Sequence, residues 1–443
     1  MDNPVTFLAY RTFAYNSNIT SVVLPESVVR IGNEVFSICD SLESVTAKGA
    51  KYINNRAFAY SPKLTQITLA DSLEEVGSYA FVGSGYYNDP NNWEDGVLYF
   101  NDCLVRCEHA TSPEKCIIKD GTRIIAVEAC LSANMKEVYM PDSVVAIGER
   151  AFQGCYSLEK LRLSESLTKI PAGAFQNCKK LTDFIIPENI TEIDGQAFDD
   201  CDSLTEVRIP AAVKMLDYAF GNCSGVKEYI VDSANENYYS EDGMIFKDDY
   251  RGKVLICYPC GRTTEVYTLP SDVNVVAGTG FSGCESLKEV KLTDNCKDIG
   301  GRAFSNCISL EKVNFPKGIK GIGERMFYGC VSLPEVTIPD TIEVIGDDAF
   351  RGCKLLKTVE IPSKVTSIGS MAFYACPLLD EMIIKSGNVR IGYMSIGYNE
   401  SGVDESGTQI VINMNKNLAI KGYKGSMPWK KELLLLRWNH RYP

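Results

Sequence analysis

The sequence predicts a repeat solenoid that is mostly β, with short 3-10 or helical turns, and that contains about 14 coils. Three observations predict this fold class. A phenylalanine recurs every 22 or 23 residues, a proline and a glycine recur at fixed distances before it, and a cysteine follows it in most repeats. Because stacked coils grow by addition, the 443 residues are expected to form one solenoid rather than several globular domains.

Thirteen phenylalanines share one position of the repeat, and Cys130 takes the same position before Phe152. They are Phe13, Phe36, Phe58, Phe81, Phe152, Phe175, Phe198, Phe220, Phe281, Phe304, Phe327, Phe350 and Phe373. No single repeat can bury its apolar face alone, so this phenylalanine column is expected to fill the interior of the stacked coils.

Each repeat begins with two extended segments, which are clear in the unit that starts at Leu333. The stretch from Leu333 to Ile338 alternates apolar and polar residues near its end, a pattern typical of a half-buried strand. Pro339 ends it, because proline has no N–H to donate to a neighbouring strand. A second extended segment then points Ile342 and Ile345 inward.

A tight corner follows the second extended segment. Gly346 opens it, and a glycine recurs there in most repeats, which indicates either a positive φ or a close approach between backbones. Ala349 and Phe350 are then expected to begin a short helical or 3-10 turn that returns the chain to the next strand.

This pattern, L-x-x-I-x-I-P-x-x-[VI]-x-x-I-G-x-x-A-F-x-x-C-x-x-L, resembles the BspA-type leucine-rich repeat and covers nearly the whole chain. The resemblance implies a right-handed leucine-rich-repeat coil. Similar proteins occur on the surfaces of gut and oral bacteria and of some parasitic protozoa, and some of them bind extracellular matrix or mediate aggregation. The resemblance therefore implies surface display but specifies no ligand.

Three segments break the period and define the organisation of the predicted solenoid over residues 1–443. The expected parts are N-terminal repeats at 1–81, a repeat with a β-hairpin insertion at 82–130, central repeats at 131–233, a second hairpin repeat at 234–280, C-terminal repeats at 281–386, and a degenerate repeat with a cap at 387–443. Within the cap, residues 409–414 indicate a strand and residues 429–438 an apolar element.

Each insertion is predicted to be a β-hairpin, in which a D-G turn, at Asp95 or at Asp242, is followed by a strand, a short loop and a second strand. Acidic and aromatic residues precede both turns. Trp93, Tyr238 and Tyr239 are candidate contacts for a partner, because exposed aromatic residues beside carboxylates can bind proteins or carbohydrates. Alternatively, they cover the apolar bases of the hairpins.

The chain has seventeen cysteines, ten of which share one column of the repeat. The column contains Cys39, Cys155, Cys178, Cys201, Cys223, Cys284, Cys307, Cys330, Cys353 and Cys376. Residues in one column point their side chains in parallel, so reduced structural thiols are expected, which favours a reducing or anaerobic setting. A redox role for Cys257 and Cys260, or a zinc site with Cys103 and Cys107, lacks the usual sequence context, so no metal or cofactor is expected.

The composition argues against several classes of function. The net charge of −12 lacks the basic footprint of a nucleic-acid-binding protein. No apolar run is long enough for a transmembrane helix, so membrane insertion is not expected. The two histidines, His109 and His440, lie in no catalytic motif, and no phosphate-binding glycine motif is present. We therefore do not expect an enzyme.

One outward-facing column is a candidate binding face. It is formed by Tyr139, Arg162, Ile185, Arg208 and Ile230, which alternate aromatic, arginine and apolar residues. Tyrosine and arginine are enriched at binding hot spots. A mixed face without a role is the alternative interpretation.

The predicted function is a non-enzymatic protein-interaction or adhesion module of a cell-surface or secreted protein. Its partner is expected to be a protein, such as a host matrix protein or another surface protein, or a glycan, and the chain is expected to be a monomer. The start of the sequence shows no signal peptide, which indicates either a trimmed chain or the alternative function, a cytoplasmic interaction scaffold with reduced thiols.

Overall fold

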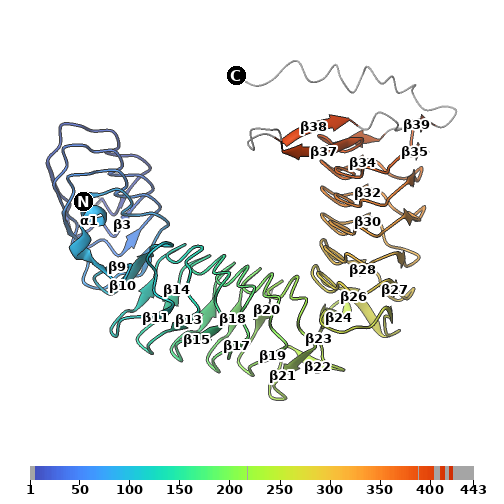
Figure 1. The fold of residues 1–443 in the computed structure, drawn as a ribbon, viewed down its shortest axis with the longest axis horizontal. Helices are drawn as coiled ribbons and strands as arrows, with labels where there is room; N and C mark the ends of the chain where they lie inside the picture. Colours follow the sequence, from blue (N-terminus) through green and yellow to red (C-terminus); the bar gives the residue numbers. More distant parts are fainter. Residues whose placement is uncertain (1–4, 217, 388, 404–409, 415–418, 423–443) are drawn as a thin grey trace. The chain divides into compact units, whose positions relative to one another are not determined.

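The computed structural model describes residues 5–216, 218–387, 389–403, 410–414 and 419–422. These residues belong to two compact units, unit 1 (1–220 and 230–237) and unit 2 (221–229 and 238–443). The predicted mostly-β solenoid is confirmed: short strands repeat from coil to coil in each unit, with about 17 turns in the chain (Figure 1). The count of about 14 is too low because Cys107, Tyr258 and Ile396 replace phenylalanine in three further coils.

The first extended segment of each coil forms one set of strands, which pair in parallel, as between Val22 and Val45 of adjacent coils. In unit 1 these strands are β2 (Ser21–Val23), β4 (Ser44–Thr46), β6 (Gln66–Thr68), β11 (Lys115–Ile117), β13 (Glu137–Tyr139), β15 (Lys160–Arg162), β17 (Asp183–Phe184) and β19 (Glu206–Ile209). In unit 2 they are β25 (Val266–Thr268), β27 (Glu289–Lys291), β29 (Lys312–Asn314), β31 (Glu335–Val336), β33 (Thr358–Ile361), β35 (Glu381–Ile384) and β39 (Ala419–Gly422). Strand β21 (Glu228–Val231) contributes residues to both units.

The second extended segment forms a separate set of short parallel strands, whose second residue is buried in nearly every coil. In unit 1 these are β1 (Phe7–Leu8), β3 (Arg30–Ile31), β5 (Tyr52–Ile53), β7 (Glu75–Val76), β12 (Ile124–Ile125), β14 (Ala146–Ile147), β16 (Lys169–Ile170), β18 (Glu192–Ile193) and β20 (Met215–Leu216). In unit 2 they are β26 (Val273–Val276), β28 (Asp298–Ile299), β30 (Gly321–Ile322), β32 (Val344–Ile345), β34 (Ser367–Ile368) and β36 (Arg390–Ile391). The predicted inward-pointing pair, Ile342 and Ile345, is fully buried.

Both predicted hairpins are present, and each has one strand more than expected. In unit 1 the insertion contains α1 (Gly85–Asn88), the 3-10 helix η1 (Pro90–Asn92), β8 (Trp93–Glu94), β9 (Val97–Phe100) and β10 (Cys103–Cys107). In unit 2 it contains β22 (Tyr239–Glu241), β23 (Met244–Asp249) and β24 (Gly252–Cys257). The last strand of each insertion pairs in parallel with the next coil, as Cys103 does with Ile124, so each hairpin replaces the second strand of one widened coil.

A ladder of stacked phenylalanine rings forms the core of the coils. Consecutive rings in each run lie 5.1–5.7 Å apart, centroid to centroid, and are close to parallel. At the first hairpin, Phe100 stacks on Phe81 at 5.0 Å and ends one run of rings. At the second, Tyr258 packs on Phe281 at 5.3 Å in the same column. The predicted core column is therefore confirmed.

The corner glycines allow close backbone approach, and they do not adopt a positive φ. A Cβ on Gly346 would lie 2.6 Å from the backbone nitrogen of Glu324 in the preceding coil, so no larger residue fits. The left-handed conformation lies two residues before and two residues after the phenylalanine, for example at Arg325 (φ 53°) and Gly329 (φ 71°) around Phe327. These left-handed residues make hydrogen-bonded turns at the place where the sequence predicted short helices.

The cysteine column links adjacent coils through hydrogen bonds. The thiol of Cys330 donates to the carbonyl oxygen of Phe304 in the preceding coil at 3.1 Å, and Cys353 donates to Phe327 at 3.3 Å. Ser61 takes the cysteine position of its coil, and its buried hydroxyl donates to Phe36 at 2.7 Å. In these coils the position holds a small side chain that carries one donor.

This hydrogen bond predicts a difference between two substitutions of Cys330. The Cys330→Ala variant loses the donor to Phe304, so its free energy of unfolding should fall by about 1 kcal/mol. The Cys330→Ser variant retains a donor, as Ser61 does, and should lose clearly less. Urea unfolding of both variants measures the difference, and equal losses would show that the thiol acts only through its volume.

Several predictions for the C-terminal region lie outside the described residues, namely the apolar element with Trp429 and Trp438, and His440. The strand predicted at 409–414 is confirmed as β38 (Ile410–Met414), which pairs antiparallel with β37 (Tyr398–Val403).

Candidate functional site

Strands β11, β13, β15 and β17 place part of the predicted binding face in one line across a sheet of unit 1. Tyr139 pairs with Arg162 on the adjacent strand, and Ile185 follows Phe184, the partner of Leu161. The structure therefore brings three of the five predicted residues together. Arg208 on β19 and Ile230 on β21 belong to the same unit, with Arg208 exposed and Ile230 half-buried.

Ile117 belongs to the same line, and sequence reasoning missed it. It pairs directly with Tyr139 and is 68% exposed, while Ile185 is 78% exposed. The hairpin insertion hid its repeat phase, because Ile117 lies between the insertion and the first regular central repeat. We call Ile117, Tyr139, Arg162 and Ile185 the exposed row.

Ion pairs hold the charged side chains of the exposed row and of its neighbours. Glu137 lies within 4.0 Å of both Lys115 and Lys160, and it accepts a hydrogen bond from the hydroxyl of Tyr139 at 3.1 Å. Lys115 lies over the Tyr139 ring at 4.9 Å. Arg162 lies 3.6 Å from Asp142. The charged side chains beside Tyr139 on this part of the sheet are therefore paired and mostly exposed.

Trp93 packs against the first hairpin. Its indole nitrogen donates to the carbonyl of Tyr87 at 2.7 Å, and the two rings meet edge to face at 5.1 Å. The hydroxyl of Tyr87 in turn donates to Glu108. Trp93 is half-buried, so it covers part of the hairpin and leaves part of its ring exposed.

The second hairpin requires one correction. Tyr238 is only 6% exposed, so the prediction that it contacts a partner is wrong, because its ring belongs to the protein interior. Tyr239 stacks on Phe246 at 5.9 Å and remains half-buried. Tyr250 is 96% exposed in the turn between β23 and β24. It was not predicted because it lies after the D-G turn, whereas the candidate aromatic residues were sought in the acidic segment before that turn.

Comparison with known protein families decides the family. A model described as the BspA type leucine rich repeat region, in six copies, matches residues 3–89, 107–240 and 259–401, which is more than half of the chain. The chain belongs to the BspA-type leucine-rich repeat family. The resemblance of the repeat pattern is thereby confirmed.

Solved structures of bacterial leucine-rich repeat proteins resemble this BspA-type chain. A leucine rich cell surface protein from Faecalibacterium prausnitzii is 27% identical with a TM-score of 0.54, and the match covers 86% of this chain and 83% of that one. The pneumococcal vaccine antigen PcpA is 20% identical with a TM-score of 0.43, covering 87% and 84%. A leucine-rich repeat protein from Eubacterium ventriosum is 25% identical with a TM-score of 0.43, covering 60% and 82%. No curated protein sequence matches the chain.

Two further searches concern membrane helices and metal ligands. Within the described residues of this BspA-type chain, no helix is long and apolar enough to cross a membrane. In the same part of the chain, no three histidine, cysteine, aspartate or glutamate side chains are grouped so that they could hold a metal ion.

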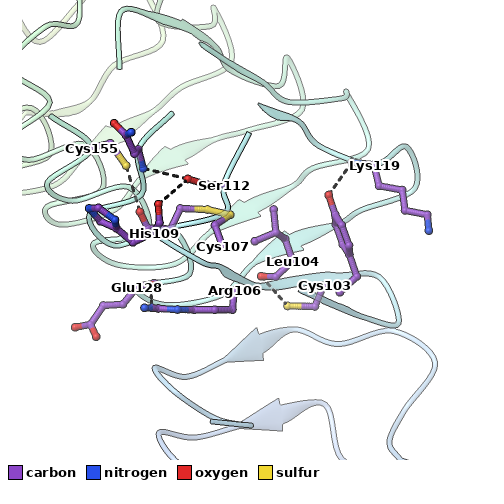
Figure 2. Close-up of a disulfide and its surroundings, with 12 residues drawn as sticks. Cys103, Leu104, Arg106, Cys107, His109, Ser112, Lys119, Glu128 and Cys155 are labelled. Carbon is purple, nitrogen blue, oxygen red and sulfur yellow. Dashed lines mark hydrogen bonds between the residues drawn. A yellow bond between two sulfur atoms is a disulfide. The ribbon is translucent and has the colours of Figure 1, made fainter. Parts of the chain in front are cut away.

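Two disulfides correct the expectation that the cysteines are reduced throughout. Cys107 and Cys130 occupy the phenylalanine position of successive coils, and they are bonded with their Cα atoms 4.8 Å apart (Figure 2). Cys260 is bonded to Cys284 of the cysteine column, with Cα atoms 4.2 Å apart. Stacking of the coils brings each pair close enough to bridge. Cys107 and Cys130 share one column, whereas Cys260 lies one residue before the cysteine column of its coil.

The other thirteen cysteines are free and buried. Burial raises the pKa of the Cys155 and Cys307 thiols to about 12 and that of Cys116 to about 11. Such thiols stay protonated at neutral pH, and the thiolate is the form that reacts with oxidants and electrophiles. Free thiols in this chain therefore do not require a reducing environment.

Thiol labelling tests this assignment. In denaturant without reductant, a thiol-specific reagent should modify thirteen cysteines and leave four unmodified in the two disulfides. The native chain at pH 8 should react slowly at all thirteen positions, because burial excludes the reagent and suppresses the thiolate. Mass spectrometry counts the labels, and seventeen labels in denaturant would contradict both bridges.

Proposed function

We propose that this chain is a non-enzymatic adhesion or protein-interaction module that is displayed at the bacterial cell surface and binds a protein or glycan of another surface. The observation that carries the proposal is the exposed row, in which Ile117 and Ile185 are 68% and 78% exposed on the same sheet as Tyr139. Exposed apolar side chains within a charged rim are typical of a protein-binding surface. Similarity to a bacterial leucine rich cell surface protein supports the location.

The disulfides support surface display over the cytoplasmic alternative. Disulfides persist mainly in oxidising compartments and are rare in the cytosol. The two bridges therefore favour a chain that acts outside the cytoplasm. The buried thiols, which suggested a cytoplasmic scaffold, are compatible with either location because they are protected from oxidation.

Binding of the purified chain to immobilised host matrix proteins and to intact host cells tests the function. Ile185→Asp places a charge in the exposed row and should weaken binding by about 10-fold or more, as should the double variant Arg162→Ala, Arg208→Ala. Val23→Asp is the matched control. Val23 is 75% exposed and lies in the same column of unit 1, but on β2, which is far in sequence from the exposed row.

Three outcomes would contradict the proposal. Binding to none of these surfaces would remove the adhesion function, and equal binding by Ile185→Asp and Val23→Asp would remove the exposed row as its site. Protease treatment of intact source cells tests the location, since a displayed chain is digested from outside. A chain that survives this treatment, and is digested only after lysis, would favour the cytoplasmic scaffold.

A further inference from the structure

A cavity of about 350 Å³ lies at the first hairpin of unit 1. Three segments that are distant in sequence line it: the loop after β6, the end of β9 with the following turn, and the loop between β11 and β12. The lining residues are Asp71, Tyr99, Asn101, Asp102, Lys119, Asp120, Gly121 and Thr122. The hairpin insertion therefore builds a concave site that an uninterrupted array of coils would lack.

The lining leaves polar groups available to a ligand. Thr122 is only 3% exposed, and within the described residues its hydroxyl makes no hydrogen bond, although other buried polar side chains such as Ser61 and Ser164 are bonded. Among the described residues, the fully enclosed side-chain oxygens without a partner are those of Thr293 and Thr341, so the Thr122 hydroxyl stays accessible to a ligand in the cavity. The exposed carboxylates of Asp71 and Asp120 have no cationic partner in the same part of the chain.

Tyr99 gives the cavity one aromatic surface and one donor. Its hydroxyl oxygen accepts a hydrogen bond from the backbone nitrogen of Lys119 at 3.1 Å. Burial raises the pKa of Tyr99 to about 12, so the phenol keeps its proton and can donate it to a ligand. All the other lining side chains are polar, apart from the glycine.

The charges narrow the class of ligand. Three carboxylates line the cavity, so an anion such as a phosphate would be repelled. The single aromatic ring offers too little apolar surface for a hydrophobic ligand. Part of this negative charge is already neutralised, because the ammonium of Lys119 lies over the Tyr99 ring at 5.8 Å and Arg123 lies 3.7 Å from Asp102. A neutral ligand with many hydroxyl groups can donate hydrogen bonds to the carboxylates and accept them from the phenol and the ammonium.

We infer that this cavity binds one or two sugar rings of a neutral saccharide. The ring of Tyr99 would pack on a sugar face, while Asp71, Asp120 and Thr122 would bond its hydroxyl groups. The volume lies near the lower limit of ligand pockets, about 300–1,000 Å³, and suits a short saccharide unit rather than a long chain. This inference rests on the proposed function of recognising another surface, and it names a ligand class for a second site beside the exposed row.

Saturation-transfer NMR and calorimetry on the full chain test the inference, with methyl glycosides of glucose, galactose, mannose and N-acetylglucosamine as probes. At least one glycoside should bind with a dissociation constant on the order of 1 mM. Asp120→Asn and Asp71→Asn should each weaken it by about 10-fold, because an amide replaces a charged acceptor. Thr122→Val should weaken it without lowering thermal stability, because its hydroxyl has no partner to lose.

Asp40→Asn is the matched control, because Asp40 is an exposed aspartate of unit 1 that lies outside the cavity. The inference is overturned if no glycoside binds, if Asp40→Asn weakens binding as much as Asp120→Asn, or if pentalysine occupies the cavity in place of a sugar. Ile185→Asp should leave glycoside binding unchanged. Loss of binding to host surfaces with retained glycoside binding would therefore reject the proposed function alone, and the reverse result would reject the cavity alone.

Discussion

Replacing Phe327 by alanine is expected to lower the free energy of unfolding of unit 2 by about 3–5 kcal/mol. Its ring is fully buried between Phe304 and Phe350, with centroids 5.4 and 5.3 Å away, and Phe315 meets it edge to face at 5.7 Å. The truncation removes buried apolar area, leaves a cavity, and interrupts the stack that joins consecutive coils. Because each coil contacts only its neighbours, the loss cannot be spread over a globular core.

Chemical denaturation followed by circular dichroism measures this loss. Tyr250→Ala is the matched control, since Tyr250 belongs to the same unit and is 96% exposed, and its removal should change stability by less than about 0.5 kcal/mol. Similar losses in the two variants would mean that the phenylalanine ladder contributes no more than an exposed ring does.

The repeat columns were predictable because one physical requirement recurs in every coil. Phe327, Gly346 and Ile345 each repeat a residue type that only one position of a stacked coil accommodates, so their spacing in the sequence reveals their place in the fold. The left-handed backbone was not predictable in the same way. It falls on residues as different as Arg325 and Asp348, which leave no common sequence signal.

The candidate sites were only partly predictable, because they depend on where the insertions join the array. Sequence phase placed Tyr139 and Arg162 on one face, but it missed Ile117, whose phase is interrupted by the first hairpin. The disulfide between Cys107 and Cys130 could be predicted only if β10 were known to belong to the coil before that of Cys130. The cavity was out of reach for the same reason, since its three lining segments meet only after the hairpin has widened its coil.

The burial of the thiols predicts that the fold is lost on the alkaline side of neutrality. The ordinary pKa of a thiol is 9.0, and burial raises the native pKa of twelve of the free thiols, to about 12 for Cys155, Cys307 and Cys376. For cysteine the protonated form is neutral, so the raised native pKa stabilises the fold below about pH 9. Above that pH the unfolded chain loses protons that the native chain retains, and stability falls until the native thiols also ionise.

The effect accumulates because twelve buried thiols have a raised pKa. Each contributes about 1.4 kcal/mol of lost stability per pH unit above its unfolded pKa. Against a total stability of about 5–15 kcal/mol for a typical domain, cooperative unfolding is expected within roughly one to two pH units above pH 9. Circular dichroism during an alkaline titration, with thiolate absorbance recorded in parallel, should show both changes at one midpoint.

Substitution separates the thiols from the tyrosines and lysines that titrate in the same range. The triple variant Cys307→Ser, Cys330→Ser, Cys353→Ser keeps a donor at each position, as Ser61 does, and removes three ionisable groups from unit 2. At high pH the variant should lose less of the unfolding free energy that it has at pH 7, so its alkaline midpoint should move to higher pH. The pH at which it unfolds in acid should not change. An unchanged alkaline midpoint would show that groups other than the cysteine column limit the stability of the coils at high pH.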